Sequence, residues 1–203
     1  GAVSFNTTGS SGYALVDNGT TALIVAQSSV GGNLILTSGH ASGITDSGTV
    51  TVGGNLTATT DANSGVINLD TLAVDGTVKL TTNGSGNATV VNDAGLNFAA
   101  STVGGALNAT ATTGNMTDSG ALTIVGTSSF TTSANNADIT LNNTNAFTGA
   151  ITLSTTGSSA HANIDGGTTA LNIAASSVGG NLYLRTGNNI TDSGTVTVGY
   201  GLV

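Results

Sequence analysis

Two phrases recur along this chain at nearly constant intervals, and that recurrence limits the folds that the chain can adopt. VGG starts at Val30, Val103 and Val178, and TDSG starts at Thr45, Thr117 and Thr191. The opening stretch also realigns with a stretch that begins at Gly149. We therefore divide the chain into a partial repeat (1–29), two repeats (30–102 and 103–177) and a second partial repeat (178–203) of a unit of about 74 residues.

A shorter period lies inside this unit. Cutting the chain before each Val or Phe that precedes a Gly-containing turn gives rungs of about 22 residues, and one longer rung of about 30 residues closes each unit. The cuts fall at Val30, Val52, Val74, Val103, Val125, Phe147, Val178 and Val198. Within each rung, short stretches such as NLILT and TVTV alternate apolar and polar residues, which is typical of strands with one buried face.

These rungs predict a parallel β-helix, or solenoid, of about eight rungs, with a three-rung super-repeat, as a single shaft over residues 1–203. Gly, Ser, Thr and Asn fill most polar positions, and 38% of the residues are hydrophobic, which favours an ordered all-β chain over disorder. One rung cannot fold alone, because stacked neighbours must supply its backbone hydrogen bonds. The inward side chains of one rung are expected to be Leu34, Leu36, Ile44 and Val50, stacked on Leu56, Val66, Ile67 or Leu69, and Leu72 of the next.

Runs such as VGGNLILTSG and GITDSGTVTVGGNLTATT resemble the haemagglutinin-type repeats of filamentous-haemagglutinin-like exoproteins, the two-partner-secreted adhesins of Gram-negative bacteria. The resemblance covers essentially the whole chain. It implies a right-handed parallel β-helix that is exported unfolded and displayed as a long rod at the cell surface. The chain starts at Gly1 and not at Met, so we expect it to be part of a longer chain or filament.

The net charge and the short apolar runs of the chain argue against nucleic acid and membrane as partners. The net charge is −8, and Lys79 and Arg185 are the only basic residues, so no nucleic-acid-binding surface is expected. The longest apolar run, residues 22–26, is far too short to insert in a membrane. Cysteine is absent, which removes disulfides and thiolate metal sites.

An Asp closes the second strand of most rungs and is the main candidate for a metal site. We expect the seven Asp side chains to form one column, which invites a Ca²⁺ interpretation because calcium needs several converging oxygen ligands. The alternative, which we favour, is that each Asp caps its own turn through a bond from its carboxylate to a nearby backbone N–H. We predict neither metal nor cofactor. The seven residues are Asp17, Asp46, Asp70, Asp93, Asp118, Asp165 and Asp192.

No catalytic constellation emerges. His40 and His161 fall in turns at different rung positions, with Tyr13 at the place equivalent to His161, and are expected to be surface turn residues. Lys79 and Arg185 should point outward, four rungs and roughly 19 Å apart. Because an enzyme acting on a polysaccharide would need its titratable residues in one cleft, we predict no enzyme.

Each long rung carries extra residues after its Asp, which include Leu96, Phe98 and Ala100 in one repeat and Leu171, Ile173 and Ala175 in the next. Their alternation predicts an added strand segment that makes a ridge at every third rung. The favoured interpretation is thicker local packing, and the alternative is a lateral contact between rods.

The expected function is that of a structural shaft of an extracellular adhesin or surface filament, in a cell-adhesive or biofilm-matrix setting. The alternative is a self-assembling subunit that stacks end to end into a fibre or sheath. The expected partners are other copies of the chain or the rest of a longer chain, and host-cell or matrix glycans. The sequence singles out no ligand-binding residue.

Overall fold

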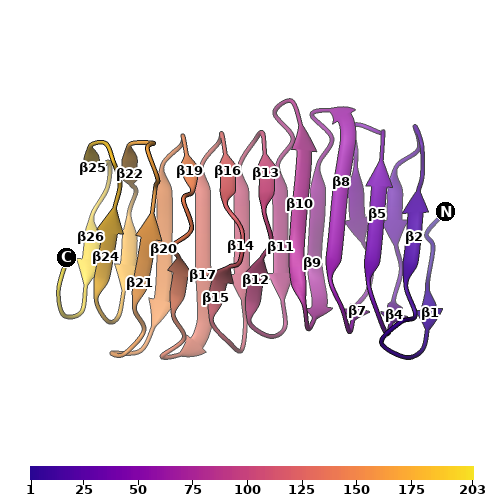
Figure 1. Cartoon of the computed structure of the whole chain (residues 1–203), viewed down its shortest axis with the longest axis horizontal. Helices are drawn as coiled ribbons and strands as arrows, with labels where there is room; N and C mark the ends of the chain where they lie inside the picture. The colour runs from indigo at the N-terminus through magenta and orange to yellow at the C-terminus, as the bar shows by residue number, and fades with distance from the viewer.

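The chain winds into an elongated solenoid of two facing parallel sheets (Figure 1). The computed structural model describes residues 1–62 and 64–203. Sheet A has 14 strands and sheet B has 12, and every pair of neighbouring strands is parallel. In Figure 1 the strands of sheet B run upward in front and those of sheet A run downward behind, while the chain advances from right to left. The coil is therefore right-handed, and the predicted parallel β-helix is confirmed.

Sheet A forms the rear wall of the solenoid in Figure 1. Its strands are β1 (Asn6–Thr7), β3 (Leu23–Val25), β4 (Ser28–Val30), β6 (Ile44–Asp46), β7 (Val50–Val52), β9 (Ile67–Val74), β11 (Ala88–Asn92), β14 (Leu107–Ala111), β17 (Ser128–Asn135), β20 (Ile151–Thr156), β22 (Leu171–Ile173), β23 (Ser176–Val178), β25 (Ile190–Asp192) and β26 (Val196–Val198). Its main path runs through ten strands, which makes nine turns, close to the eight rungs expected.

Sheet B forms the front wall. Its strands are β2 (Ala14–Asp17), β5 (Leu34–Ser38), β8 (Leu56–Asn63), β10 (Thr77–Asn83), β12 (Leu96–Phe98), β13 (Ser101–Val103), β15 (Met116–Asp118), β16 (Leu122–Ile124), β18 (Ile139–Leu141), β19 (Ala146–Phe147), β21 (Ala162–Asp165) and β24 (Leu182–Arg185).

The core is a continuous apolar layer between the two sheets. Alternate residues of each strand enter it, as the period-two pattern requires, so that β5 is buried at Leu34, Leu36 and Ser38. The predicted inward residues of the first rung are all buried, and so are Leu56, Ile67, Leu69 and Leu72 in the next. Val66 is only half-buried, because strand β9 begins after it and places Ile67 and Leu69 inward instead.

Turn length is nearly constant, and this corrects the predicted long rung. Hydrogen bonds between neighbouring turns join residues that are 19 residues apart at Asn87 and Ala106 and 23 residues apart at Asp138 and His161. The register partners of the strands fall within the same range. The extra residues do form strands that pack, namely β3, β12 and β22, and β12 buries both of its inward side chains. They make no ridge, because each of these strands continues a turn of ordinary length.

The extra residues instead shift the repeat by half a turn around the solenoid. Strands β4 and β23, which carry the first and third copies of the VGG phrase, are joined in sheet A by seven successive pairings through β7, β9, β11, β14, β17 and β20. Strand β13, which carries the second copy, lies in sheet B. Two repeats therefore make seven turns, and one repeat of three and a half turns places its successor on the opposite face.

The VGG phrase recurs because each copy seals a junction with the turn before it. Thr7, Thr82 and Thr155 each donate a side-chain hydrogen bond to a carbonyl four or five residues ahead, which closes a tight turn. The same hydroxyl groups accept the N–H of Gly31, Gly104 and Gly179, respectively, the first glycine of each VGG. A side chain at this glycine would collide with the backbone of the earlier turn, so only glycine fits.

A buried serine bridges the break that precedes the strand of each VGG phrase. Ser101 lies between β12 and β13, where its hydroxyl donates to the Ala99 carbonyl at 2.8 Å and accepts the Leu80 N–H at 3.0 Å. Ser28 and Ser176 make the same two bonds in their own repeats. Because these serines turn inward, the preceding Ala100 and Ala175 face solvent, contrary to the predicted alternation.

Candidate functional site

The seven Asp residues do not form one column. The half-turn shift distributes them over both walls: Asp17, Asp118 and Asp165 lie in sheet B, Asp46, Asp70 and Asp192 lie in sheet A, and Asp93 follows a strand of sheet A. Among the residues that the structure describes, no three His or Asp side chains converge to a point where a metal ion could be held. The arrangement that invited the Ca²⁺ interpretation is therefore wrong.

Four of the seven Asp side chains cap backbone N–H groups, in two different ways, and within the described residues the side chains of Asp70, Asp93 and Asp192 cap none. Asp17 accepts the N–H of Gly19 at 2.9 Å, and Asp165 accepts that of Gly167 at 2.8 Å, which confirms the predicted capping of the residue's own turn. Asp46 instead caps the next turn, where it accepts the N–H groups of Asp70 and Thr71.

Asp118 does the same in the opposite wall, where it accepts the N–H groups of Asn142 and Asn143. At Asp46 and Asp118 the prediction of own-turn capping is wrong. The reason is that the N–H groups they accept are left free by the strands: those of Asp70 and Thr71 lie at a bulge in β9, and those of Asn142 and Asn143 lie between β18 and β19.

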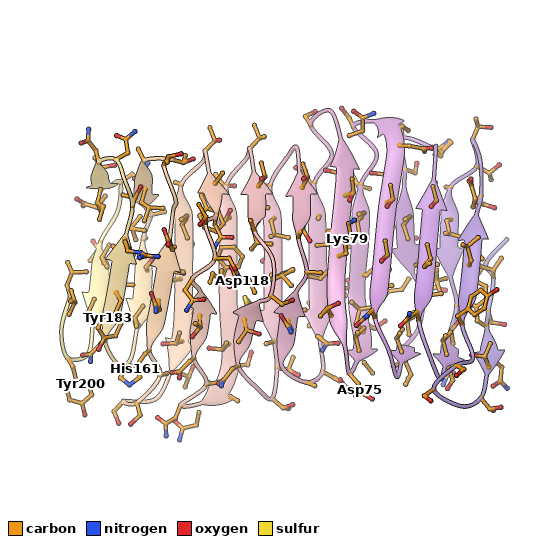
Figure 2. All side chains as sticks on the ribbon, in the orientation of Figure 1. Asp75, Lys79, Asp118, His161, Tyr183 and Tyr200 are labelled. Carbon is orange, nitrogen blue, oxygen red and sulfur yellow. The ribbon has the colours of Figure 1, made fainter. Side chains whose placement is uncertain are left out.

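Both histidines lie in turns, as predicted, and both are half-buried. His40 Nδ1 accepts the N–H of Ser42 at 3.0 Å. His161 belongs to a ladder along the lower edge of the rod, on which Figure 2 labels it: its own N–H donates to Asp138, and its Nδ1 accepts the N–H of Asn181 at 2.9 Å. At the equivalent place in the first copy, Tyr13 is exposed. In both histidines Nδ1 is used as a hydrogen-bond acceptor for the backbone.

The two basic residues point outward from sheet B, as predicted, but they lie five turns apart and not four. The pairings from β10 to β24 run through β12, β15, β18 and β21. Their separation is therefore nearer to ~24 Å. Lys79 is exposed on β10, and Arg185 forms an ion pair with Asp165, whose side chain is only 7% exposed.

The ion pair was missed at the level of sequence, although a signal existed. Asp165 and Arg185 are 20 residues apart, which is one turn, and each follows a Leu or Ile at an inward position. Residues one turn apart at equivalent outward positions are direct neighbours in a parallel sheet.

The surface around this pair is the candidate site. A shallow hollow of about 490 Å³ opens on the outer face of sheet B, near the C-terminal end of the rod, and Figure 2 labels Tyr183 there. Tyr183 pairs in register with Asn163, and Arg185 pairs with Asp165. The Tyr183 hydroxyl is held by the side chain of Asn181 at 2.9 Å. The hollow is lined by Asn142, Asn163, Asp165, Tyr183, Leu184, Arg185 and Val203.

What this arrangement offers is a set of groups suited to binding: an aromatic ring, two side-chain amides and an ion pair. The described residues also contain no helix that is long and apolar enough to cross a membrane.

Comparison with known proteins gives a family and no closer relative. No curated protein matches the chain, and no solved structure matches it. A family model described as repeats of unknown function (DUF5649) matches residues 85–154 and 159–202, which is more than half of the chain. The starts of the two matched segments, at positions 85 and 159, are one sequence repeat apart. The chain therefore belongs to this family of repeats of unknown function.

Proposed function

We propose that this chain is a non-enzymatic shaft segment of an extracellular adhesin or surface filament, which holds binding surface away from the cell. The observation that carries the proposal is the unbroken stack: every turn pairs in parallel with the next over the whole length. Nine turns at ~4.8 Å each give a rod of roughly 43 Å.

The hydrogen-bond arrangement supports a mechanical role. In a solenoid of this kind the backbone bonds run along the rod axis, so bending the rod must stretch bonds in one wall and compress them in the other. The outward positions carry mostly Thr, Ser and Asn, which suits a surface that presents binding groups to solvent. Recognition of nucleic acid would need clustered basic side chains instead.

The test is the denatured mass of the native polypeptide that carries this sequence, together with its location in fractionated cells. A surface-exposed chain of hundreds of kilodaltons supports a covalent shaft. A surface protein near 19.4 kDa would contradict the covalent shaft. Recovery only from the cell interior would overturn the extracellular role.

A second candidate is a subunit that stacks end to end, and one observation favours it. The sequence ITDSGTVTV occurs at residues 44–52 and again at residues 190–198. In the first place it forms β6 and β7, which pair with β9 at Ile44, Thr45 and Val50–Val52. In the second place it forms β25 and β26, so the same sequence offers the same pairing groups to a strand of another copy. Growth of purified chains into fibres in electron micrographs would support this candidate, and a monodisperse monomer at high concentration would contradict it.

A further inference from the structure

We propose that the outer face of β21 and β24 is a binding site for a neutral saccharide. We call it the Tyr183 patch and define it by Asn142, Asn163, Asp165, Tyr183 and Arg185. The inference deepens the proposed function, since it names where a shaft of this kind would hold a target, and it rests on that function only for its biological setting.

The patch breaks the repeat on the outside only. The strand that follows VGG has Ile35 and Thr37 at its outward positions in the first copy, and Asn108 and Thr110 in the second. In the third copy the same positions carry Tyr183 and Arg185. The inward Leu182 is kept, as Leu34 in the first copy and Leu107 in the second. Stacking therefore does not require an aromatic ring and a guanidinium here.

The side chains of the patch are held in place before any ligand arrives. The Asn181 side chain donates to the Tyr183 hydroxyl, which fixes the ring along the strand. Asp165 is fixed by the Gly167 N–H and in turn fixes the Arg185 guanidinium, which is still 77% exposed. A group that is already ordered loses little entropy on binding.

Part of the hydrogen-bonding capacity of the patch remains unused. Within the described residues, the side-chain amides of Asn142 and Asn163 make no hydrogen bond, and both line the hollow. Each amide offers two donors and one acceptor, and the guanidinium offers further donors. Vicinal hydroxyl groups of a sugar, which both donate and accept, match such a set, while the C–H face of a pyranose ring packs on an aromatic ring.

Charge selects a neutral saccharide over an anionic one. The Asp165 carboxylate cancels the charge of Arg185, and the chain as a whole carries −8. An anionic oligosaccharide would be repelled by this field, and Arg185 is already committed to its partner. The shallow hollow suits the side of an extended oligosaccharide and not a deeply enclosed single ring.

The test is an NMR titration of the ¹⁵N-labelled chain with four neutral probes: cellohexaose, mannohexaose, xylohexaose and chitohexaose. The expected result is that at least one probe shifts the side-chain amide signals of Asn142 and Asn163, with saturation in the millimolar range or below. Shifts from none of the four probes would overturn the proposal. Shifts with an oligogalacturonate and none of the neutral probes would overturn the neutral class.

Three variants identify the site by borrowing the residues of the first copy, which the same fold accepts: Tyr183→Ile, Arg185→Thr and Asn163→Leu. Tyr183→Ile is expected to weaken binding roughly tenfold, through loss of the ring. Lys79→Thr is the matched control, since it removes the same charge from the same sheet outside the patch, and it should leave affinity unchanged. Equal binding by Tyr183→Ile and the parent chain would overturn the proposal. Neither result depends on chain length at the cell surface, so failure here and failure of the shaft proposal are distinguishable.

Discussion

The first and second full repeats, residues 30–102 and 103–177, carry the same phrases on opposite walls of the rod. In the first repeat the VGG phrase leaves sheet A after β4, and in the second it leaves sheet B after β13. The junction contacts are nevertheless the same, with a threonine hydroxyl accepting the glycine N–H at 3.2 Å in one and 3.0 Å in the other. The same backbone contacts at the junction therefore form in either wall of the solenoid.

The core contents of the two repeats differ. Strand β8 places Leu56 and Ala58 inward, whereas the equivalent positions of β17 carry Ser128 and Phe130. Phe130 meets Phe147 edge-on at 5.8 Å between ring centroids, and the first repeat has Val74 at the position of Phe147. The comparison teaches that backbone junctions are fixed residue by residue, while the size of the core side chains varies between repeats.

The largest expected effect tests whether the junction is fixed. Gly104→Ala places a Cβ 1.8 Å from the Gly84 carbonyl oxygen, which the stacked backbone can relieve only by opening the junction. We expect a loss of about 4–5 kcal/mol in the free energy of unfolding, measured by urea denaturation followed by circular dichroism.

The control for this variant is Gly187→Ala, whose Cβ has its nearest neighbour at 3.3 Å. A loss below about 1 kcal/mol is expected there. If Gly104→Ala were as mild as the control, the junction would not be the reason for the repeated phrase.

A somewhat smaller effect tests the core of the second repeat. Phe130→Ala removes a fully buried ring and its contact with Phe147, and should cost about 3–4 kcal/mol. Adding Ser128→Leu to this variant recreates the Leu and Ala pair of the first repeat and should recover part of the loss. No recovery in the double variant would show that the Leu and Ala pair cannot replace the Ser and Phe pair in the second repeat.

The smallest effects separate two buried serines. Ser101→Ala removes an acceptor from the Leu80 N–H and should cost about 1–3 kcal/mol, because that donor stays buried. Ser128→Ala should change stability by less than about 0.5 kcal/mol, since the Ser128 hydroxyl is buried without a partner in the described part of the chain. The same urea experiment measures both, and equal losses would contradict the bridging role given to Ser101.

The parallel β-helix and most of its inward residues could be predicted from the sequence, because alternation and recurrence follow directly from strand stacking. Leu34, Leu36, Ile44 and Val50 were found from alternation alone. The sequence could not decide whether Val66 or Ile67 points inward. Which alternate residues of a strand face the core depends on where the preceding turn ends.

The half-turn shift could not be predicted, and two errors follow from it. The sequence of a long rung fits one enlarged turn as well as it fits a normal turn followed by part of another. The register of β10 with β12 decides for the second, because their paired residues are one ordinary turn apart. The same ambiguity made the Asp residues look like one column. The Tyr183 patch was missed for a different reason, because its members come from three turns and become neighbours only when the turn length is known.

The half-turn shift also has a mechanical consequence. Whatever makes one wall slightly longer than the other in every unit, such as the break before each VGG strand, recurs on the opposite wall three and a half turns later. Each tendency to curve is therefore followed by an equal tendency in the reverse direction. A solenoid built from many such units would run straight over long distances, although no single unit is symmetric.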